Sequence, residues 1–277
     1  MYKNNDPILS VELYAISDTQ TSLNGEHSHS YHELYFMLEG NSRHFINNKI
    51  MDISAGQAAF VWQGYVHKVL YNADQSSRRL LVNFNSAFIG EEYWPLLREL
   101  RHRKHLTFTP EVSDTIKHML LSLHAEKQEN GKHSLLQCQN ILRQIIILLS
   151  RQPVLDPPQS ISQNETIIQQ AAQYISSHYP EPLTLQSLSQ EFFMSESHFS
   201  RTFKKYTGMG VAEYIKYTRL RAAEKLLMQK ASTVTEIAFA CGFNNSNYFI
   251  CEFKKHHGVT PLKYAATTDK KQKKATQ

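Results

Sequence analysis

Two stretches near the carboxyl end of the chain repeat one pattern, and this repeat constrains the fold more than any other feature. The first stretch reads LTLQSLSQEFFMSESHFSRTFKKYTG from residue 183, and the second reads VTEIAFACGFNNSNYFICEFKKHHG from residue 234. Six residues of the first copy recur fifty positions later in the second, namely Phe199, Phe203, Lys204, Lys205, Gly208 and Tyr214 as Phe249, Phe253, Lys254, Lys255, Gly258 and Tyr264. Each copy predicts a short helix, a tight turn and a second helix. The chain therefore contains a duplicated two-helix unit.

The turns of the two copies differ at one position. Gly242 in the second copy can adopt the left-handed conformation without steric cost, whereas Phe193 occupies the same place in the first copy. A bulky residue there predicts a turn that is shaped differently or strained. Ser195 follows, where its hydroxyl can cap the second helix of that copy.

Spacings of three and four residues divide each second helix into an aromatic inner face and a polar outer face. The predicted inner faces hold Phe199, Phe203 and Tyr206 in the first copy, and Tyr248, Phe249 and Phe253 in the second. The outer faces begin with small polar residues and end with lysines, which suits helices whose first turns meet base edges and whose last turns meet phosphates. Two packed hairpins with solvated lysines are the alternative.

The region 166–266 resembles the DNA-binding domain of the AraC/XylS family of bacterial transcription regulators. The resemblance rests on the motifs FSRTFKKYTG, RLRAAEKLL, TEIAFACGF and YFICEFKKHHGVTP. It implies two helix-turn-helix units joined by one long helix at 211–228, with reading helices that enter successive major grooves roughly 34 Å apart. The predicted DNA-contacting residues are Ser197, Ser200, Arg201, Lys204 and Lys205 in the first unit, and Ser246, Asn247, Ile250, Cys251, Lys254 and Lys255 in the second.

Three of these positions carry specific expectations about bases. Arg201 can bind guanine bidentately, Asn247 can bind adenine, and Ile250 can contact a thymine methyl group. Cys251 departs from the family, in which an arginine is usual at this place. Together with the neighbouring Glu252, which would repel phosphate, it predicts weaker sequence discrimination by the second unit.

The first half of the chain has a different pattern, which predicts an α+β fold of two domains. Short alternating runs broken by turn residues at 11–85 indicate a small β-barrel or sandwich, and helical spacing returns at 91–150. We expect one domain at 1–152, a proline-containing linker at 153–165, the DNA-binding domain at 166–266 and a basic, disordered tail at 267–277.

Two segments of the predicted barrel, HSHSYHELYFMLEG and GQAAFVWQGYVH, resemble the signature motifs of cupins. In metal-using cupins the matching positions bind one ion, and here they are His27, His29, Glu33 and His67. Imidazole and carboxylate ligands suit a divalent transition metal, although the same side chains can serve as polar pocket walls without any metal. We therefore expect no required cofactor and treat the metal as an open alternative.

The same segments predict an effector pocket. Strand periodicity places Glu33, Tyr35 and Met37 on one face of the strand after His29. The predicted pocket residues are His27, His29, Glu33, Tyr35, Trp62 and His67. Hydrogen-bonding groups beside flat aromatic rings suit a sugar or sugar phosphate, while ordinary barrel core is the alternative. A phosphate could also meet Arg43, His44, Arg78 and Arg79, unless these are exposed strand charges.

Composition and the absence of targeting patterns predict a cytoplasmic protein. The 277 residues suffice for two domains, the formal net charge is +5, and the cysteines Cys138, Cys241 and Cys251 lack paired spacing. The amino terminus has no apolar core of a signal peptide, and no apolar run reaches membrane-spanning length.

Together these patterns predict a transcription regulator and not an enzyme, specifically an activator of carbohydrate-utilisation genes. Its partners would be double-stranded DNA, a small effector and RNA polymerase. The apolar face of helix 135–150 predicts a homodimer by resemblance to the family, with packing inside the chain as the alternative. A metal-dependent cupin enzyme fused to a DNA-binding domain, and a regulator that needs no effector, are the competing functions.

Overall fold

The computed structural model describes residues 7–16, 29–71, 76–153, 162–229 and 232–266. Within these ranges the chain forms two compact units that divide next to Glu165, the first built on β-sheets and the second wholly helical. The predicted α+β fold with two domains is thus confirmed. Most of the predicted linker (154–161) and the predicted basic tail (267–277) lie outside the described residues.

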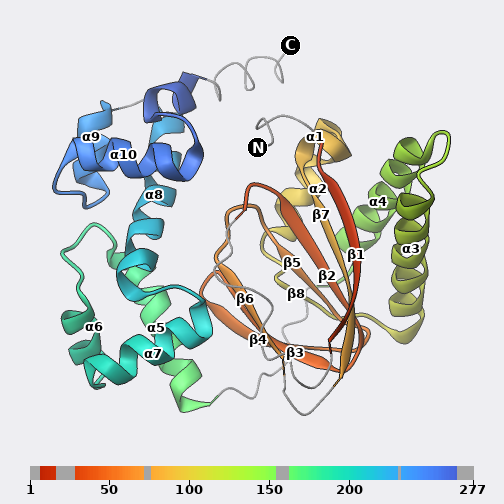
Figure 1. Cartoon of the computed structure of the whole chain (residues 1–277), viewed down its shortest axis with the longest axis horizontal. Helices are drawn as coiled ribbons and strands as arrows, with labels where there is room; N and C mark the ends of the chain where they lie inside the picture. The colour runs from red at the N-terminus through yellow and green to blue at the C-terminus, as the bar shows by residue number, and fades with distance from the viewer. Residues whose placement is uncertain (1–6, 17–28, 72–75, 154–161, 230–231, 267–277) are drawn as a thin grey trace. The chain divides into compact units, whose positions relative to one another are not determined.

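Eight antiparallel strands in two sheets form the centre of the first unit (Figure 1). Their bounds are β1 Leu9–Ile16, β2 His32–Glu39, β3 Asn41–Ile46, β4 Lys49–Ser54, β5 Ala58–Val61, β6 His67–Tyr71, β7 Ser77–Phe84 and β8 His105–Leu106. One sheet has the order β1-β7-β2-β5-β8 and the other β4-β3-β6. The strands at 11–85 follow the alternating pattern of the sequence, whereas β8 is only two residues long and too short for any pattern to indicate.

The turn between β3 and β4 fixes the register of the smaller sheet. Asn47 and Asn48 both have positive φ, at 42° and 69°, as a two-residue hairpin turn of the type I′ family requires. Asparagine tolerates this left-handed conformation better than most residues. The turn pairs Ile46 with Lys49, and the ladder then continues to Asn41 opposite Ser54.

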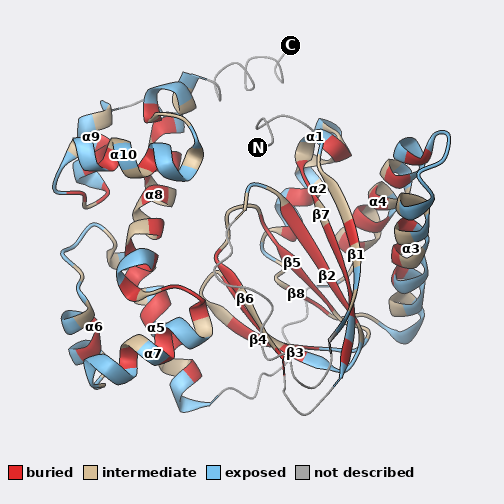
Figure 2. Cartoon of the chain, in the orientation of Figure 1, coloured by how far each residue is buried: buried red, intermediate tan, exposed pale blue. Residues whose placement is uncertain are grey.

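The space between the two sheets is filled by a group of side chains that we call the inter-sheet core. It consists of Tyr35, Met37, Ile46, Met51, Ile53, Ala59, Val61 and Leu81. Alternation along β2 follows the prediction, because Tyr35 and Met37 face this core while Leu34 and Phe36 face the helices on the other side of the sheet. Figure 2 shows how much of the larger sheet is buried.

Helices cover the outer side of the five-stranded sheet (Figure 1). They are α1 Ser86–Ile89, the 3₁₀ helix η1 Glu91–Tyr93, α2 Trp94–Leu100, α3 Pro110–Glu129 and α4 Ser134–Ser150. Thr109 caps α3 through its hydroxyl, and Pro110 supplies a first residue whose φ already suits a helix. On α4, Leu142, Ile145 and Ile146 are fully buried in the same core as the sheet. Packing inside the chain therefore accounts for most of the apolar face that suggested a dimer.

The second unit contains six helices within the described ranges. They are α5 Gln163–His178, α6 Leu185–Glu191, α7 Glu196–Thr207, α8 Val211–Gln229, α9 Val234–Ala240 and α10 Ser246–His257. Helix α5 begins inside the stretch that was predicted to be linker. Its start is a reciprocal cap, in which the amide of Ser162 donates to Glu165 at 2.7 Å and the amide of Glu165 donates to Ser162 at 3.4 Å.

Two short scaffold helices begin with the same device. Thr184 and Ser187 form a capping box at α6, and Thr233 and Glu236 form one at α9. Seven residues are too few for a helix that is stable alone, so the caps and the buried faces must hold these helices together. The predicted cap at Ser195 is also present, since its hydroxyl accepts from the amide of His198 at 3.4 Å.

Helix α8 is the predicted connecting helix and packs on both copies of the repeat. Tyr214 on its first turn meets Phe203 of the first copy with ring centroids 5.2 Å apart. Leu220 and Leu227, further along, belong to one core with Phe249 of the second copy. Figure 1 shows α8 running between the α5–α7 group and the α9–α10 group.

Candidate functional site

The outer face of α7 is open to solvent, as the sequence predicts. Ser197, Arg201, Lys204 and Lys205 are exposed, and Ser200 is half-buried. The inner residues Phe199 and Phe203 are fully buried, with their rings 5.7 Å apart. Tyr206 is only half-buried. The buried pair fixes the rotation of the helix, so the polar and basic side chains share one free face.

Helix α10 repeats this arrangement with one error in the predicted inner face. Asn247, Cys251, Lys254 and Lys255 are exposed, while Ser246 and Ile250 are half-buried. Tyr248 was expected inside but is 52% exposed. It precedes the fully buried Phe249 and is therefore rotated by about 100° from that inner position. Its ring lies against Phe243 of the preceding turn, with centroids 6.3 Å apart.

The acidic residue on α10 is neutralised by a partner that the sequence did not reveal. The carboxylate of Glu252 lies 2.6 Å from Nζ of Lys216 on α8. The hydrogen bond from Lys216 holds the pKa of Glu252 below its usual value, and the same bond raises the pKa of Lys216. Glu252 was expected to repel phosphate, but this ion pair offsets its charge.

A second ionic cluster fastens the end of α10 to α8. Glu224 is 5% exposed and lies 2.5 Å from Arg221 and 3.2 Å from Nε2 of His257. Burial acts to raise the pKa of Glu224, but His257 and Arg221 outweigh it, so the pKa falls below its ordinary value. Sequence reasoning missed this cluster, because Glu224 and His257 are far apart in the sequence and only the fold joins them.

The two turns that precede α7 and α10 differ as the sequence predicts. Phe193 adopts a left-handed conformation with φ 53° and is 98% exposed. Gly242 has φ 82°, and a Cβ built there would lie 2.6 Å from the carbonyl oxygen of Pro180. Glycine is therefore required by space at one turn, whereas at the other turn a phenylalanine carries backbone strain without burying its ring.

Three of the four predicted metal ligands come together at one end of the space between the sheets. Glu33 lies on β2, His67 begins β6, and His29 precedes β2. An oxygen of Glu33 lies 3.3 Å from Nε2 of His29 and 3.7 Å from Nε2 of His67. Potential ligand atoms of the three residues lie within 4.8 Å of one another. The fourth candidate, His27, lies outside the described residues.

The orientation of both imidazoles suits a metal. Nδ1 of His29 bonds the carbonyl of Tyr31 at 2.8 Å, and Nδ1 of His67 bonds the carbonyl of Tyr65 at 3.1 Å. These bonds turn both Nε2 atoms toward Glu33, which is how outer hydrogen bonds orient metal-binding histidines. Nε2 of His29 is buried, and the polar group that it faces is the carboxylate of Glu33, 3.3 Å away. The donor set therefore fits a divalent transition metal.

Mutual attraction sets the charges in this cluster. Burial alone would raise the pKa of Glu33, but His67 and His29 reverse the effect and lower it. Burial alone would lower the pKa of His67, but Glu33 reverses that effect and raises it. Glu33 is therefore ionised at neutral pH and can accept hydrogen bonds from a ligand or bind a cation.

Tyr35 lies further along the same face of β2 as Glu33, within the inter-sheet core. Its hydroxyl is 3.2 Å from the hydroxyl of Ser42 and 3.4 Å from that of Tyr71, and Ser42 in turn bonds His44 at 2.9 Å. These polar side chains come from strands of both sheets. A polar network therefore lies within an otherwise apolar interior.

Trp62 was wrongly expected in the pocket. It packs on the opposite side of the larger sheet, where its ring lies 5.4 Å from Trp94 and 4.5 Å from His32. Val61, the preceding residue, faces the inter-sheet core. Because neighbouring residues of a strand point to opposite faces, Trp62 must point toward the helices.

The helices in the described ranges are all too short or too polar to cross a membrane.

Two family models match the chain. The AraC-like ligand binding domain matches residues 9–146, and a helix-turn-helix domain matches residues 188–267. Together they cover most of the sequence.

Named relatives match over most of their length. The HTH-type transcriptional activator RhaS of Klebsiella pneumoniae is 23% identical over 240 residues, which is 85% of either chain. The HTH-type transcriptional activator RhaR of Mannheimia succiniciproducens is 27% identical over 258 residues, or 88% of either chain. Among solved structures, the C-terminal domain of AraT, a response regulator from Geobacillus stearothermophilus, is 32% identical, with a TM-score of 0.37. That match covers 38% of this chain and 88% of the other.

Proposed function

The chain belongs to the AraC/XylS family of bacterial transcription regulators, and on that premise we propose that it is a sequence-specific DNA-binding activator controlled by a small molecule. Relatives of similar length carry the name of transcriptional activators, which supports activation over repression. Such a protein acts in the cytoplasm, where it meets bacterial DNA and RNA polymerase. Carbohydrate-utilisation genes are the targets we infer from the polar lining of the first unit.

One observation carries the DNA-binding proposal. Two helices, α7 and α10, each bury a pair of phenylalanines and leave a polar face that ends in two exposed lysines. Two hairpins that merely packed together would not need matching basic ends. A duplicated reading helix does need them, because phosphate contacts set the position and orientation of each helix on the duplex.

Individual contacts follow from the chemistry of the exposed side chains. Arg201 reads guanine and Asn247 reads adenine through paired hydrogen bonds, and Ile250 offers its exposed part to a thymine methyl group. Ser197, Ser200, Ser246 and Cys251 complete the base-facing set. Phosphates meet Lys204, Lys205, Lys254 and Lys255. We infer that the first unit supplies more of the sequence discrimination, because it carries the arginine.

The effector binds between the two sheets of the first unit. Glu33 and His67 provide charged hydrogen-bonding groups, and Tyr35 provides a hydroxyl and an aromatic face. This combination supports a sugar or sugar phosphate. A ligand can change DNA binding only if it has different affinities for two arrangements of the protein. We propose that effector binding shifts that balance through the sheets, the linker or the dimer contacts.

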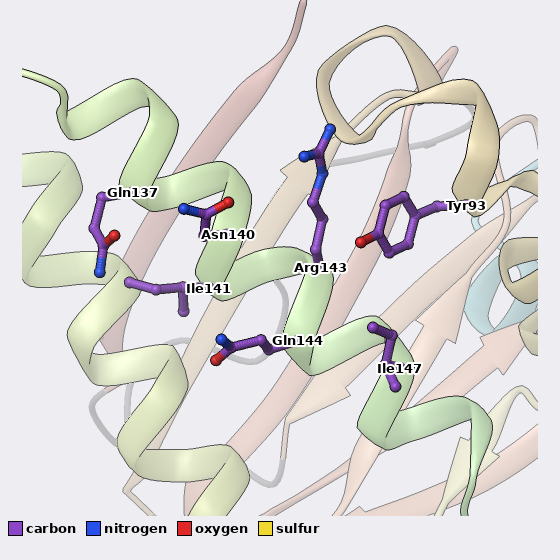
Figure 3. A pocket seen from close by; sticks show the side chains of 7 residues that line it. All are labelled: Tyr93, Gln137, Asn140, Ile141, Arg143, Gln144 and Ile147. Carbon is purple, nitrogen blue, oxygen red and sulfur yellow. The ribbon is translucent and has the colours of Figure 1, made fainter.

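We propose that the protein is a homodimer through α4. The helix buries most of its apolar side chains within its own chain, but Leu135 and Leu136 are 60% and 55% exposed. A groove of about 340 Å³ lies between α4 and Tyr93 of η1, and Figure 3 shows Ile141 and Ile147 lining it together with polar side chains of α4. A second copy of α4 would cover these apolar groups.

A metal-dependent enzyme fused to a DNA-binding domain is the second candidate, favoured by one observation. His29, Glu33 and His67 would hold a divalent metal through two imidazole nitrogens and one carboxylate. A bound metal would act as a Lewis acid on a hydroxyl or carbonyl group. This function requires turnover that a chelator abolishes, whereas a sensor requires only a change in DNA binding.

The test of DNA binding begins with selection of sites from a randomised DNA library by the full chain. We expect Arg201→Ala to weaken binding to the selected site by about 1–3 kcal/mol and to relax the preference at one base, whereas Lys254→Ala weakens selected and random DNA alike. Lys117→Ala, on the exposed side of α3 in the first unit, serves as a control that changes neither. A library without enrichment would refute sequence-specific binding, and equal losses on both DNAs for Arg201→Ala would refute its role as a base reader.

A further inference from the structure

Arg79 is an arginine buried between the two sheets. It lies on β7, two residues before Leu81, which belongs to the inter-sheet core. Alternation along the strand therefore points Arg79 inward and Arg78 outward. Arg79 is 6% exposed, whereas Arg78 is exposed and pairs with Glu39 at 2.7 Å. The two neighbours thus differ completely in environment.

Three tyrosine rings surround the guanidinium group of Arg79. Its central carbon lies 4.7 Å from the ring centre of Tyr14, 5.1 Å from that of Tyr35 and 5.4 Å from that of Tyr71. These rings come from β1, β2 and β6, so strands of both sheets contribute. Ring faces attract the cation, and they also leave the planar edge of the guanidinium available for hydrogen bonds.

Within the described part of the chain, no carboxylate pairs with Arg79, and its Nε atom is buried with no hydrogen-bond partner. Arg43 on β3, the central strand of the smaller sheet, differs in this respect, since it pairs with Asp52 at 2.7 Å and with Glu165 at 2.6 Å. The buried carboxylate of β2, Glu33, is already engaged by His29 and His67. The space between the sheets therefore has a cation that lacks a counter-ion among the described residues. Its contacts there are the tyrosine rings and a hydrogen bond with Tyr35, which leave its charge without an anion to neutralise it.

We propose that Arg79 is an anion-binding residue of the effector site, so that the effector carries a phosphate or carboxylate group as well as hydroxyl groups. This inference rests on the proposed binding of an effector between the sheets. A guanidinium binds either group through two parallel hydrogen bonds. The rings of Tyr35 and Tyr71 lie against it and carry hydroxyls 3.4 Å apart that could donate further bonds.

The spacing of the polar groups matches a small sugar derivative. Glu33 and Tyr35 lie two residues apart on one face of β2, which is about 7 Å along a strand. An effector with its anionic group at Arg79 would present its hydroxyls to Glu33 and His67. Met37 and Met51 line the same core, and their flexible, unbranched side chains can repack around a ligand. The inferred class is therefore a sugar phosphate or sugar acid, in preference to a neutral sugar.

The test uses calorimetric melting of the full chain with matched sets of sugars. Each set contains a neutral hexose, its 6-phosphate and its uronate, so that phosphate and carboxylate are compared on one scaffold. The variants are Arg79→Gln and, as the control, Arg78→Gln on the opposite face of the same strand. We expect one charged member to raise the Tm of wild type and Arg78→Gln, and to bind Arg79→Gln about 10- to 100-fold more weakly. Without ligand, the Tm of Arg79→Gln should equal or exceed that of wild type, because an unpaired buried charge is removed.

Each other outcome overturns the inference. If a neutral sugar stabilises wild type and Arg79→Gln equally, the protein has an effector site between the sheets, but Arg79 does not bind an anionic group of the effector. If no charged member shifts wild type, the inference fails, while binding to the selected DNA in the same samples shows whether the DNA-binding proposal survives. Should Arg79→Gln not fold, Arg79→Lys takes its place. Its single ammonium cannot form the paired bonds, so an undiminished Tm shift in Arg79→Lys would overturn the inference.

Discussion

Replacement of Phe193 by glycine should stabilise the helical unit, although it removes a large apolar side chain. The residue has φ 53°, in the left-handed region that side chains with a Cβ disfavour, and its ring is almost fully exposed. At the equivalent turn of the second copy the chain has Gly242 at φ 82°. The substitution therefore gives the first turn the residue that the second turn already uses.

The expected gain is the difference between two backbone terms. A left-handed conformation costs about 1–2 kcal/mol in a residue with a Cβ, and glycine removes this strain. Glycine also loses more conformational entropy on folding, which lowers the free energy of unfolding by about 0.5–1 kcal/mol. The ring contributes little, since it buries almost no area. The free energy of unfolding should therefore rise by about 0.5–1 kcal/mol, by the difference of these terms.

Urea unfolding can separate the two units of the full chain. Both tryptophans, Trp62 and Trp94, lie in the first unit, so their fluorescence reports the sheets, whereas far-ultraviolet ellipticity also follows the helical unit. We expect Phe193→Gly to raise the urea midpoint measured by ellipticity and to leave the midpoint measured by tryptophan fluorescence unchanged. Phe193→Ala keeps the strain and should change nothing.

The matched control is Gly242→Ala. Its Cβ would lie 2.6 Å from the carbonyl oxygen of Pro180, so this variant should lose more than about 1 kcal/mol. A lower midpoint for Phe193→Gly would refute the reasoning, because it would mean that the exposed ring, or a turn preference of phenylalanine, stabilises the folded state.

Three further predictions follow from contacts in the two units. Lys216→Met should weaken binding to any DNA by up to about fivefold at low salt, because Glu252 then lies near the phosphates without its ion-pair partner. The additional change Glu252→Gln in the same chain should restore the affinity, and fluorescence anisotropy would measure both effects. Burial lowers the pKa of His44 to about 3 in the folded chain. Between about pH 6.5 and pH 3, His44 is therefore protonated in the unfolded chain but neutral in the folded chain. His44 should therefore lower the free energy of unfolding by up to about 1.4 kcal/mol for each unit by which the pH falls. His32 has a pKa lowered in the same way and adds its own slope, so His44→Gln should reduce the pH dependence of the urea midpoint followed by tryptophan fluorescence; an equal slope in both proteins would contradict this. Leu136→Glu should convert the proposed dimer to monomer in sedimentation velocity, whereas Lys117→Glu should not, and an unchanged sedimentation coefficient for Leu136→Glu would exclude α4 as the interface.

The helical unit could be predicted closely because its repeat supplies an internal comparison. Alignment of the copies located α7 and α10, the strained turn at Phe193 and the connecting helix. It failed at Tyr248, which has no tyrosine or phenylalanine counterpart in the first copy, because His198 holds the equivalent place. The ion pair of Glu252 with Lys216 was also missed, since helical spacing describes one helix and gives no partner on another.

The sheet unit was less predictable, because alternation along a strand shows which residues share a face but not which face is buried. Alternation along β2 correctly placed Glu33 and Tyr35 on one face. Trp62 follows Val61 at the end of β5, so the same alternation turns it to the opposite face, toward the helices and away from the predicted pocket. Likewise, Arg78 and Arg79 looked equivalent as neighbouring strand charges. Only the structure shows which of them points inward, because Leu81, two residues after Arg79 on β7, belongs to the inter-sheet core.

Helix α8 makes the two copies of the repeat depend on each other. Its first turns complete the core of one copy through Tyr214, and its last turns complete the core of the other through Leu220 and Leu227. A fragment that carried only one copy would leave half of this helix with its apolar side chains in water. Loss of either copy should therefore destabilise the other, because α8 would keep an uncovered apolar face.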